Sequence, residues 1–461
     1  MNNKDRISEL AEGSLGKLLL KYSWPALVAM SLNALYSVVD RFYIGQGCGE
    51  AAMAGLTLTF PVMILFGAFG VFIGAGHAAL LSIRLGECDR VSCEKILGEL
   101  VALKLILFFI LPPLVFFNLD SVLNWCGGGK VTPEAFNAAK QYLKLVVFSH
   151  VFSHLSFGLS AAMRSEGRAL QSMLCMVVGF GTNLILDPIF IFTFKMGIEG
   201  AAWATNVAMF TSCLYAIWQY SGNRPVVRLR LRRIGIYGKI FWRAAAIGFA
   251  PFLQQLLASV INVSLSVAFV KWAVDDAVAT TQIASLGVFQ GMMILVVMPV
   301  MGAQQGLQPI IGYNWGARNF KRVGEAVKHG LWLTTVFCVI ACIIQVVPPL
   351  PELMVRMFVS ADNSELVRIA SRDLQISNCM LWCISLNIVA TTYFQSIGHP
   401  MTAIVLSTLR QGLCILPVIW FLPYFMEDKN LAIWLSMPIS DVACCLMTAI
   451  PFALHMRFLS R

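Results

Sequence analysis

The sequence predicts an all-α integral membrane protein in which twelve transmembrane helices form two pseudo-symmetric six-helix bundles. The chain has 461 residues, of which 58% are hydrophobic and 13% are charged, and its mean hydropathy is +0.74. About a quarter of the residues in an average soluble domain are charged, so the bilayer is the expected solvent. Long apolar windows and an internal repeat of about half the chain are the other two observations behind this prediction.

Twelve apolar windows define the expected spans in chain order. About twenty apolar residues suffice for a helix that crosses a hydrocarbon core roughly 30 Å thick. The windows cover residues 17–44, 51–82, 94–118, 140–163, 170–194, 200–221, 240–271, 280–312, 327–350, 370–396, 402–426 and 431–458. Several windows are longer than the bilayer requires, so we expect helices that are long, tilted or protruding.

Basic residues in the connecting loops predict the orientation, because cytoplasmic loops carry an excess of Lys and Arg. The segment between the sixth and seventh windows carries Arg224, Arg228, Arg230, Arg232, Arg233 and Lys239. The opposite loops, such as VDDAV and MEDKN, are poorer in basic residues, although the ninth connection carries Arg356, Arg368 and Arg372. We therefore expect a multi-pass protein of a bacterial plasma (inner) membrane with both termini in the cytoplasm.

The net charge of +10 does not indicate a nucleic-acid partner, because the basic residues lie in short segments between apolar windows. The thirteen cysteines show neither metal-ligand spacing nor the framework of a secreted disulfide domain. No glycine-rich phosphate loop follows a predicted strand, which argues against intrinsic ATP hydrolysis. We expect membrane lipids and a small molecule as partners, a monomer, and no metal or organic cofactor.

Motifs recur at an interval close to half the chain. Pro25 and Pro251 are 226 residues apart, and Gly86 and Gly316 are 230 residues apart. The segment that begins RSEG at residue 164 aligns with the segment that begins QSIG at residue 395. We therefore predict an N-terminal bundle over residues 1–221, a basic cytoplasmic linker over 222–239, and a C-terminal bundle over 240–461. Repeated halves with a substrate site between them are a common transporter architecture.

The stretch NLILDP, residues 183–188, places polar groups inside an apolar window. An acidic residue in a span is costly to insert and is therefore a functional candidate. Asn183 and Asp187 are four residues apart and share a helix face. Pro188 has no N–H, so the carbonyl of Leu184 loses its helical partner. These oxygen atoms suit a hard cation, and a buried carboxylate is also a proton carrier.

Two further polar residues lie at a similar depth. Asp187 lies about 25 Å above the cytoplasmic start of its window, and Asp40 lies about 36 Å above the start of the first window. Thr205 lies roughly 8 Å below the outer end of its window. All belong to the first half, whereas the positions that match the two acids in the second half are Ser266 and Val418. This asymmetry predicts a cation or proton site in the N-terminal bundle, although helix bracing by Asp187 or an Asp40–Arg41 pair is the structural alternative.

Other polar or adaptable residues are weaker candidates for the substrate cavity or a gate. Glu166 lies between Arg164 and Arg168 at a cytoplasmic helix end, where a salt bridge or a gate is expected. Asp441 has either a functional role in the central cavity or a structural role, and Met292 belongs either to an adaptable binding wall or to ordinary packing. We expect Lys104 and Arg410 to extend to the cytoplasmic interface by snorkelling. Three histidines are expected to serve in helix packing rather than as proton relays: His77, His150 and His154.

These motifs together resemble the multidrug and toxic compound extrusion (MATE) transporters, in particular the bacterial multidrug-exporting branch. The resemblance rests on Pro25 and Asp40, NLILDP, GIEGAAWAT, QPIIGYNWGARN and the paired RSEG and QSIG segments, and it covers essentially the whole chain. It implies a V-shaped pair of bundles, alternating access and export of organic cations in exchange for Na⁺ or H⁺. The residues that match the N-terminal cation site of relatives are Asp40, Asn183, Asp187 and Thr205.

Another branch of the family has acidic residues in the seventh and tenth spans. Here the seventh window has Gln254 and Gln255, and the tenth has no acid after Asp373 near its outer start, which argues against that second site. The expected function is thus a secondary active antiporter of cationic or amphiphilic compounds. The alternatives are a flippase for a lipid-linked precursor, a membrane-embedded enzyme and a channel. An enzyme would require a catalytic cluster near an interface, and the sequence has no such cluster, so we expect no enzymatic activity.

Overall fold

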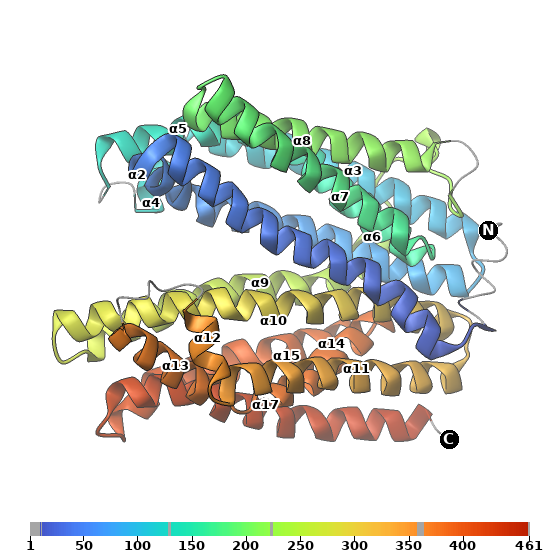
Figure 1. The fold of residues 1–461 in the computed structure, drawn as a ribbon. Coiled ribbons are helices and arrows are strands. Elements are labelled where there is room, and N and C mark those ends of the chain that lie inside the picture. The colour runs from blue at the N-terminus through green and yellow to red at the C-terminus, as the bar shows by residue number, and fades with distance from the viewer. Residues whose placement is uncertain (1–9, 11, 128–130, 222–224, 357–363, 460–461) are drawn as a thin grey trace.

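The computed structural model describes residue 10 and residues 12–127, 131–221, 225–356 and 364–459, and within these ranges it contains helices and no β-strand (Figure 1). The N-terminal half begins with the 72-residue helix α2 (Leu15–Gly86). Its other helices are α3 (Arg90–Phe117), α4 (Leu119–Trp125), α5 (Pro133–Val146), α6 (His150–Ser165), α7 (Ala169–Pro188) and α8 (Gly197–Tyr220). Helix α2 contains two spans, because Gly49 adopts φ 82° and ψ −178° and breaks the helix, a conformation that favours glycine.

The C-terminal half follows the linker, which contains a 3₁₀ turn at Leu231–Arg233. Its longer helices are α9 (Gly238–Trp272), α10 (Asp276–Gly316), α11 (Phe320–Val346) and α17 (Lys429–Leu459). The shorter helices are α12 (Leu350–Val355), α13 (Ser364–Asn378), α14 (Ile384–Ser396), α15 (Pro400–Thr408) and α16 (Leu416–Phe421). Helices α13 and α14 together form one span, and α15 and α16 are joined by a π-helical segment at Leu409–Ile415.

The predicted spans are confirmed in the described part of the chain. Nine helical segments there are long and apolar enough to cross a membrane, or ten if the bent pair α5 and α6 is one span. The first part of α2 and the 24-residue helix α8 occupy the two remaining windows. A helix of this length extends about 36 Å, which is enough to cross a hydrocarbon core of roughly 30 Å. Most helices extend a few residues past the predicted windows because backbone hydrogen bonding continues beyond the hydrocarbon boundary.

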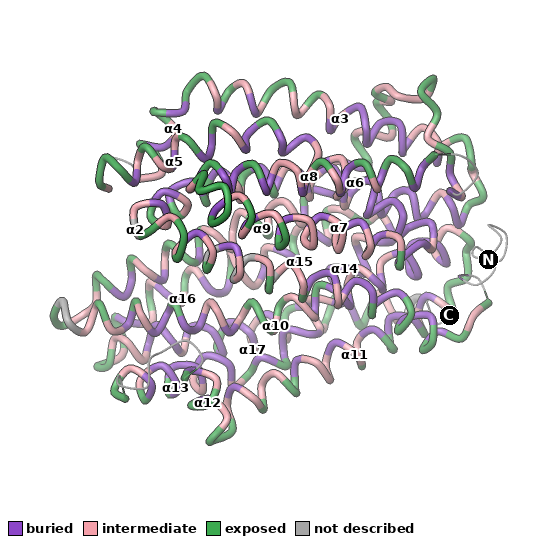
Figure 2. Tube along the Cα trace, turned by 45° about the horizontal axis from the view of Figure 1, so that its top comes forward, coloured by how far each residue is buried: buried purple, intermediate pink, exposed green. Residues whose placement is uncertain are grey.

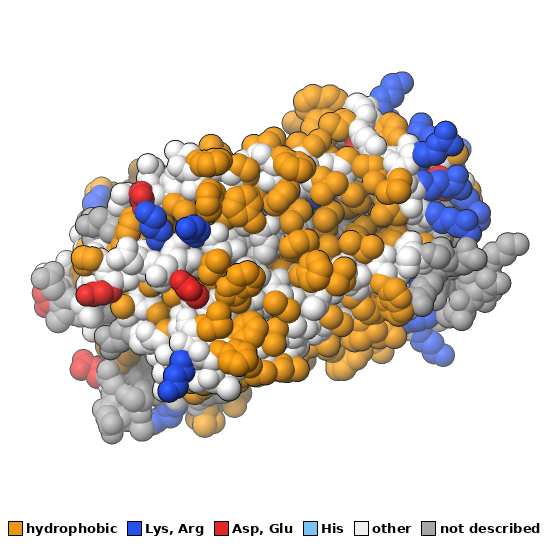
Figure 3. Space-filling view, turned by 90° about the horizontal axis from the view of Figure 1, so that it is seen from above, with side chains coloured by type: hydrophobic (Ala, Val, Ile, Leu, Met, Phe, Trp, Pro, Cys, Tyr) orange, Lys and Arg blue, Asp and Glu red, His pale blue; other side chains and the backbone are white. Residues whose placement is uncertain are grey.

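The two halves form two layers of helices, with α2 to α8 in one and α9 to α17 in the other (Figure 1). Hydrophobic side chains cover the middle of the molecule, and Lys and Arg side chains gather at one end (Figure 3). We call this the basic end; it carries the connections from α2 to α3, from α8 to α9 and from α10 to α11. The start of α2 and the end of α17 also lie there (Figure 1).

The buried cores show how the halves are joined. One hydrophobic cluster contains residues of both halves, among them Tyr22, Leu97, Ala244 and Tyr313. The remaining clusters each belong to one half: one lies in the C-terminal half, and two lie in the N-terminal half. Buried residues accordingly lie where the layers meet near the basic end and also within each separate bundle (Figure 2). The bundles therefore share a core at the basic end and have separate cores towards the opposite end.

Glycine residues permit the close contact of α2 with α10. A β-carbon on Gly86 would overlap the carbonyl oxygen of Tyr313, and a β-carbon on Gly316 would overlap that of Ile83. Both pairs of equivalent positions, Gly86 with Gly316 and Ile83 with Tyr313, are 230 residues apart in the chain. The predicted repeat is therefore visible as a reciprocal contact between equivalent helices.

Helix capping repeats at the same interval. Asp89 accepts a hydrogen bond from the backbone N–H of Ser92 at 3.0 Å and caps α3. Asn319 accepts one from Arg322 N–H at 3.3 Å and caps α11. Both side chains satisfy one of the N–H groups that a helix start leaves without a partner. The hydrogen bonds shift the pKa of Asp89 below its usual value.

The snorkelling predictions for Lys104 and Arg410 are wrong. Lys104 is fully buried, and its Nζ donates a 2.6 Å hydrogen bond to the carbonyl oxygen of Gly70. Arg410 turns into the C-terminal bundle, where its Nε lies 2.7 Å from Asp441 Oδ1. In both cases a polar partner inside the bundle replaces the interface that the side chain was expected to reach.

Candidate functional site

The polar stretch on α7 is buried within the N-terminal bundle. Asn183 is 2% exposed and Asp187 is 1% exposed, whereas Leu184 between them is 41% exposed. The prediction that Asn183 and Asp187 share an inward face is therefore confirmed. Helix α7 ends at Pro188, and a π-helical turn over Ile189–Thr193 follows. The backbone hydrogen bonding therefore changes from α-helical to π-helical directly after Asp187. Such turns frequently occur at functional sites.

Hydrogen bonds connect α7 to α8. Asn183 Nδ2 donates to Asp187 Oδ1 at 3.3 Å and lies 3.5 Å from the hydroxyl oxygen of Thr205. Thr205 belongs to α8 and is itself buried. The amide of Asn183 thus links the carboxyl group of Asp187 to the hydroxyl group of Thr205.

Asp40 reaches the same cluster from the first part of α2. Its side chain is buried and lies close to the carboxyl group of Asp187. Two carboxyl groups that lie close together can share a proton or an ion. The structure therefore brings Asp40, Asn183, Asp187 and Thr205 together from three helices.

Two tyrosines in the cluster were not found from the sequence. The hydroxyl groups of Tyr36 and Tyr142 both lie near the hydroxyl group of Thr205. The ring of Tyr36 also stacks on Phe180 of α7, with 5.3 Å between the ring centroids. Tyr36 lies one helical turn before Asp40, so the i, i+4 spacing could have indicated it. Tyr142 on α5 carries no comparable sequence signal.

A cavity of about 160 Å³ lies beside this cluster. Its polar wall includes Tyr36, Asn183 and Thr205, and its apolar wall includes Phe157 and Met176. The cavity is thus enclosed by α2, α6, α7 and α8 within one bundle. Its size suits water molecules or an ion rather than a drug-sized compound, because drug-sized ligands occupy about 300 Å³ or more.

The donor set fits a hard cation or a proton. Asn183 Oδ1 is buried and accepts no hydrogen bond within the described part of the chain, so this oxygen is available to an ion or to water. Asp40, Asp187 and Thr205 supply further oxygen atoms of the kind that hard cations prefer. Among the described residues, no group of three or more His, Cys, Asp or Glu side chains is placed to hold a metal ion. Two carboxylates with neutral oxygens therefore suit a monovalent ion better than a structural divalent metal.

Glu166 lies apart from the cluster, at the basic end. Its carboxylate accepts hydrogen bonds from Tyr220 Oη at 2.9 Å and from the backbone N–H of Val226 at 3.1 Å. Arg168 Nη1 lies 3.8 Å from Glu166 Oε2. Burial raises the pKa of Glu166 to about 7. Because Val226 follows α8, Glu166 attaches the linker to the N-terminal bundle, and the expected salt bridge is present.

The remaining candidates lie in the C-terminal half. Gln254 and Gln255 are exposed on α9. Met292 is buried in a hydrophobic cluster with Phe289 and Trp434, so it packs in the core rather than forming an open wall. Asp441 pairs with Arg410 inside the bundle, so it faces a neighbouring helix. The structure does not bring these four residues into the N-terminal cluster.

The MatE family model matches this chain over residues 25–189 and 252–421. The chain belongs to the MATE family. Among its relatives is the multidrug export protein MepA of Staphylococcus haemolyticus, 23% identical, with 95% of this chain and 93% of the relative covered. MepA of Staphylococcus aureus is 26% identical, with 93% and 92% covered. Both relatives are therefore matched over nearly their full length.

Solved MATE structures have the same fold as this chain. An outward-facing MATE multidrug resistance transporter of the MOP superfamily superimposes with a TM-score of 0.90 at 20% identity, covering 98% of both chains. The MATE multidrug transporter DinF-BH, solved in complex with R6G, superimposes with a TM-score of 0.84 at 29% identity, covering 95% of both chains. The fold is therefore twelve transmembrane helices in two bundles, as predicted.

MATE membership confirms the resemblance proposed from the motifs. The family consists of transporters, so this protein is a multi-pass plasma-membrane transporter and not an enzyme. The two matched segments fall one in each half of the chain. Asp40, Asn183 and Asp187 of the buried cluster lie in the first of them, and Thr205 lies beyond its end.

Proposed function

We propose that this MATE transporter is a secondary antiporter that exports organic cations or amphiphilic compounds in exchange for H⁺ or Na⁺ by alternating access. The observation that carries the proposal is the convergence of Asp40 and Asp187 in a buried cluster with Asn183 and Thr205. Buried carboxyl groups inside a membrane bundle are costly, and their usual role is in ion or proton pathways.

The carboxyl pair provides the coupling element. Two ionised carboxylates that lie close together repel each other strongly away from water. A proton or a sodium ion between Asp40 and Asp187 removes this repulsion, so binding favours the conformation that holds the two side chains together. Coupling requires that this affinity differs between the two conformations of the transporter. Helices α2 and α7 carry the two acids, so a relative movement of these helices would change the affinity.

The arrangement of the bundles supports the alternating-access part of the proposal. The halves share a hydrophobic core at the basic end and have separate cores towards the opposite end. With the basic end in the cytoplasm, as the Lys and Arg distribution predicts, this conformation is closed to the cytoplasm. A second conformation would separate the contact of α2 with α10 at Gly86 and Gly316 and close the opposite end.

The substrate class rests on the relatives. Two MepA relatives are called multidrug export proteins, and DinF-BH was solved with R6G bound. A mainly apolar molecule with a positive charge suits the apolar composition of the spans, whose 18-residue windows contain at most two charged residues each. Cationic amphiphiles are therefore the compounds to test first. We also propose that the protein functions as a monomer, because each chain contains both bundles.

Proteoliposomes of purified protein loaded with ethidium test this function. A sodium gradient and a proton gradient are imposed separately on the wild type, on Asp187→Asn and on Asp120→Asn. Asp120 is a suitable control because its carboxylate is exposed and forms only a surface pair with Lys140 at 2.7 Å. Efflux driven by one gradient, lost in Asp187→Asn and retained in Asp120→Asn, would support antiport and name the ion. Efflux that Asp187→Asn retains at normal expression would refute the coupling role, and no efflux under either gradient would favour the lipid-precursor flippase.

A further inference from the structure

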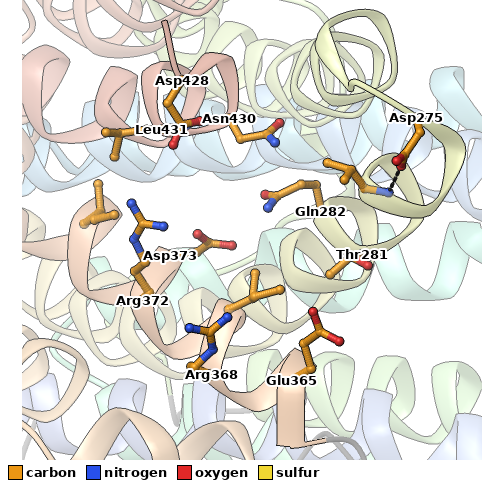
Figure 4. A pocket seen from close by; sticks show the side chains of 13 residues that line it. Asp275, Thr281, Gln282, Glu365, Arg368, Arg372, Asp373, Asp428, Asn430 and Leu431 are labelled. Carbon is orange, nitrogen blue, oxygen red and sulfur yellow. Dashed lines mark hydrogen bonds between the residues drawn. The ribbon is translucent and has the colours of Figure 1, made fainter.

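A second polar cavity lies in the C-terminal bundle at the end opposite the basic end. It has a volume of about 460 Å³ and lies between the starts of α10, α13 and α17 (Figure 4). The residues that line it are mostly charged or polar: Asp275, Val278, Thr281, Gln282, Glu365, Arg368, Ile369, Arg372, Asp373, Ile376, Asp428, Asn430 and Leu431. None of them belongs to the cluster around Asp187, so a role for this cavity is independent of the coupling site.

One wall of the cavity, formed by α13, carries two guanidinium groups together with the carboxyl groups of Glu365 and Asp373. Arg368 and Arg372 lie four residues apart on α13 and so occupy one face of the helix. Both guanidinium groups point into the cavity (Figure 4). Within the described part of the chain neither group forms a hydrogen bond or an ion pair. Two such groups one helical turn apart are suited to a carboxylate or a phosphate, which arginine binds through paired hydrogen bonds.

The facing walls are anionic. Asp275 accepts a 2.7 Å hydrogen bond from the backbone N–H of Val278 at the start of α10. Asp428 accepts a 3.0 Å hydrogen bond from Leu431 N–H at the start of α17. Each cap holds one carboxylate oxygen in place and leaves the second oxygen for another partner. The caps therefore fix two carboxylates on the walls that face the arginines.

The floor of the cavity is rigid and polar. Asp373 is 5% exposed and accepts a 2.6 Å hydrogen bond from Ser285 Oγ. Gln282 is 8% exposed, and its Oε1 accepts a 2.9 Å hydrogen bond from Trp434 Nε1. That bond fixes the amide, whose nitrogen donates to no other described residue and lies on the cavity side (Figure 4). Trp434 itself is packed in the hydrophobic cluster beneath, so the floor cannot shift easily.

We propose that this cavity binds a small zwitterion in which a phosphate or carboxylate is joined to an ammonium group. The anionic group would lie between Arg368 and Arg372, and the ammonium group would face Asp428 and Asp275. A simple cation would meet two guanidinium groups, and a simple anion would meet four carboxylates, so each alone is disfavoured. The cavity has four carboxyl groups and two guanidinium groups, so the ammonium group would have carboxylate partners while the anionic group pairs with the arginines.

A zwitterion of this kind has two sources, a soluble metabolite or the phosphoethanolamine headgroup of a lipid. For the soluble source, isothermal titration calorimetry of the purified full-length protein would use O-phosphoethanolamine, ethanolamine and inorganic phosphate. We expect O-phosphoethanolamine to bind more tightly than either single-charge probe. Arg368→Gln and Arg372→Gln should each weaken that binding by about ten- to hundred-fold, the range for a lost charge-assisted hydrogen bond. Arg356→Gln is the control, because this exposed residue follows α12 outside the cavity and should leave binding unchanged.

For the lipid source, thermal unfolding would be compared in nanodiscs of phosphatidylglycerol with and without phosphatidylethanolamine. Stabilisation by phosphatidylethanolamine that is lost in Arg368→Gln identifies the headgroup, whereas calorimetric binding without this stabilisation identifies a soluble zwitterion. Both Arg368 and Arg372 are exposed, so either single variant is expected to fold, and elution from a sizing column checks this. Binding of inorganic phosphate as tight as that of the zwitterion would overturn the proposal. So would binding unaffected by both arginine variants, or no response to any probe or lipid.

Discussion

The reciprocal contact of α2 with α10 allows a direct test of how the two bundles are held together. Substituting Gly86 by alanine adds one methyl group where the carbonyl oxygen of Tyr313 already lies, and Gly316→Ala does the same against Ile83. In each case the obstacle is backbone, which cannot turn aside as a flexible side chain can. The added carbon must therefore push the helices apart at the basic end.

The size of the effect follows from overpacking. Forcing an extra carbon into a close-packed contact costs about 1–3 kcal/mol. The cost arises only while the two helices are in contact, so it acts on the balance between conformations. A difference of about 1–3 kcal/mol corresponds to roughly a 5- to 150-fold shift in that balance. We therefore expect Gly86→Ala to depopulate the state closed at the basic end.

Hydrogen–deuterium exchange with mass spectrometry measures this shift. Backbone amides in residues 76–86 and 302–316 should exchange faster in Gly86→Ala, and those near the opposite end should exchange more slowly. Gly67→Ala and Gly287→Ala are matched controls on α2 and α10, because no atom lies within 4 Å of a β-carbon at either position. Wild-type exchange in a folded Gly86→Ala protein, or the same change in Gly67→Ala, would refute the reasoning.

Three further predictions concern single side chains. Tyr36→Phe should weaken binding of the coupling ion about three- to ten-fold, which corresponds to the loss of one hydrogen bond. Tyr43→Phe is the control and should leave ion binding unchanged. Titration of the coupling ion in efflux assays measures both variants. Because the folded pKa of Glu166 is raised to about 7, stability should decrease as pH rises from about 4.5 to 7, by on the order of 3 kcal/mol. Melting temperatures of the wild type and Glu166→Gln across that window test this, and equal pH slopes would contradict it. Asp441→Asn should destabilise the protein by about 1.5–3 kcal/mol by removing the charge-assisted hydrogen bond of the partly buried Arg410, and an unchanged melting temperature would disprove that role.

The fold class, the twelve spans and the repeat could all be predicted from the sequence. These properties depend on local composition, because a helix that crosses a bilayer must bury its own backbone polar groups and expose apolar side chains. The shared face of Asn183 and Asp187 was equally predictable, since the helical period alone brings residues four apart together. Depth along the helix axis added Asp40 and Thr205, because the rise per residue is constant.

Lateral relations between helices were decided only by the tertiary structure. The rotation of each helix about its axis selects the partner of a long side chain, which is why Arg410 pairs with Asp441 and Lys104 bonds to Gly70 instead of reaching the interface. The same rotation places Tyr142 of α5 beside Thr205. The cavity at Arg368 needs three helix starts from distant parts of the sequence to meet. The sequence determines which residues a membrane helix contains, but the packing of all helices determines which of them touch.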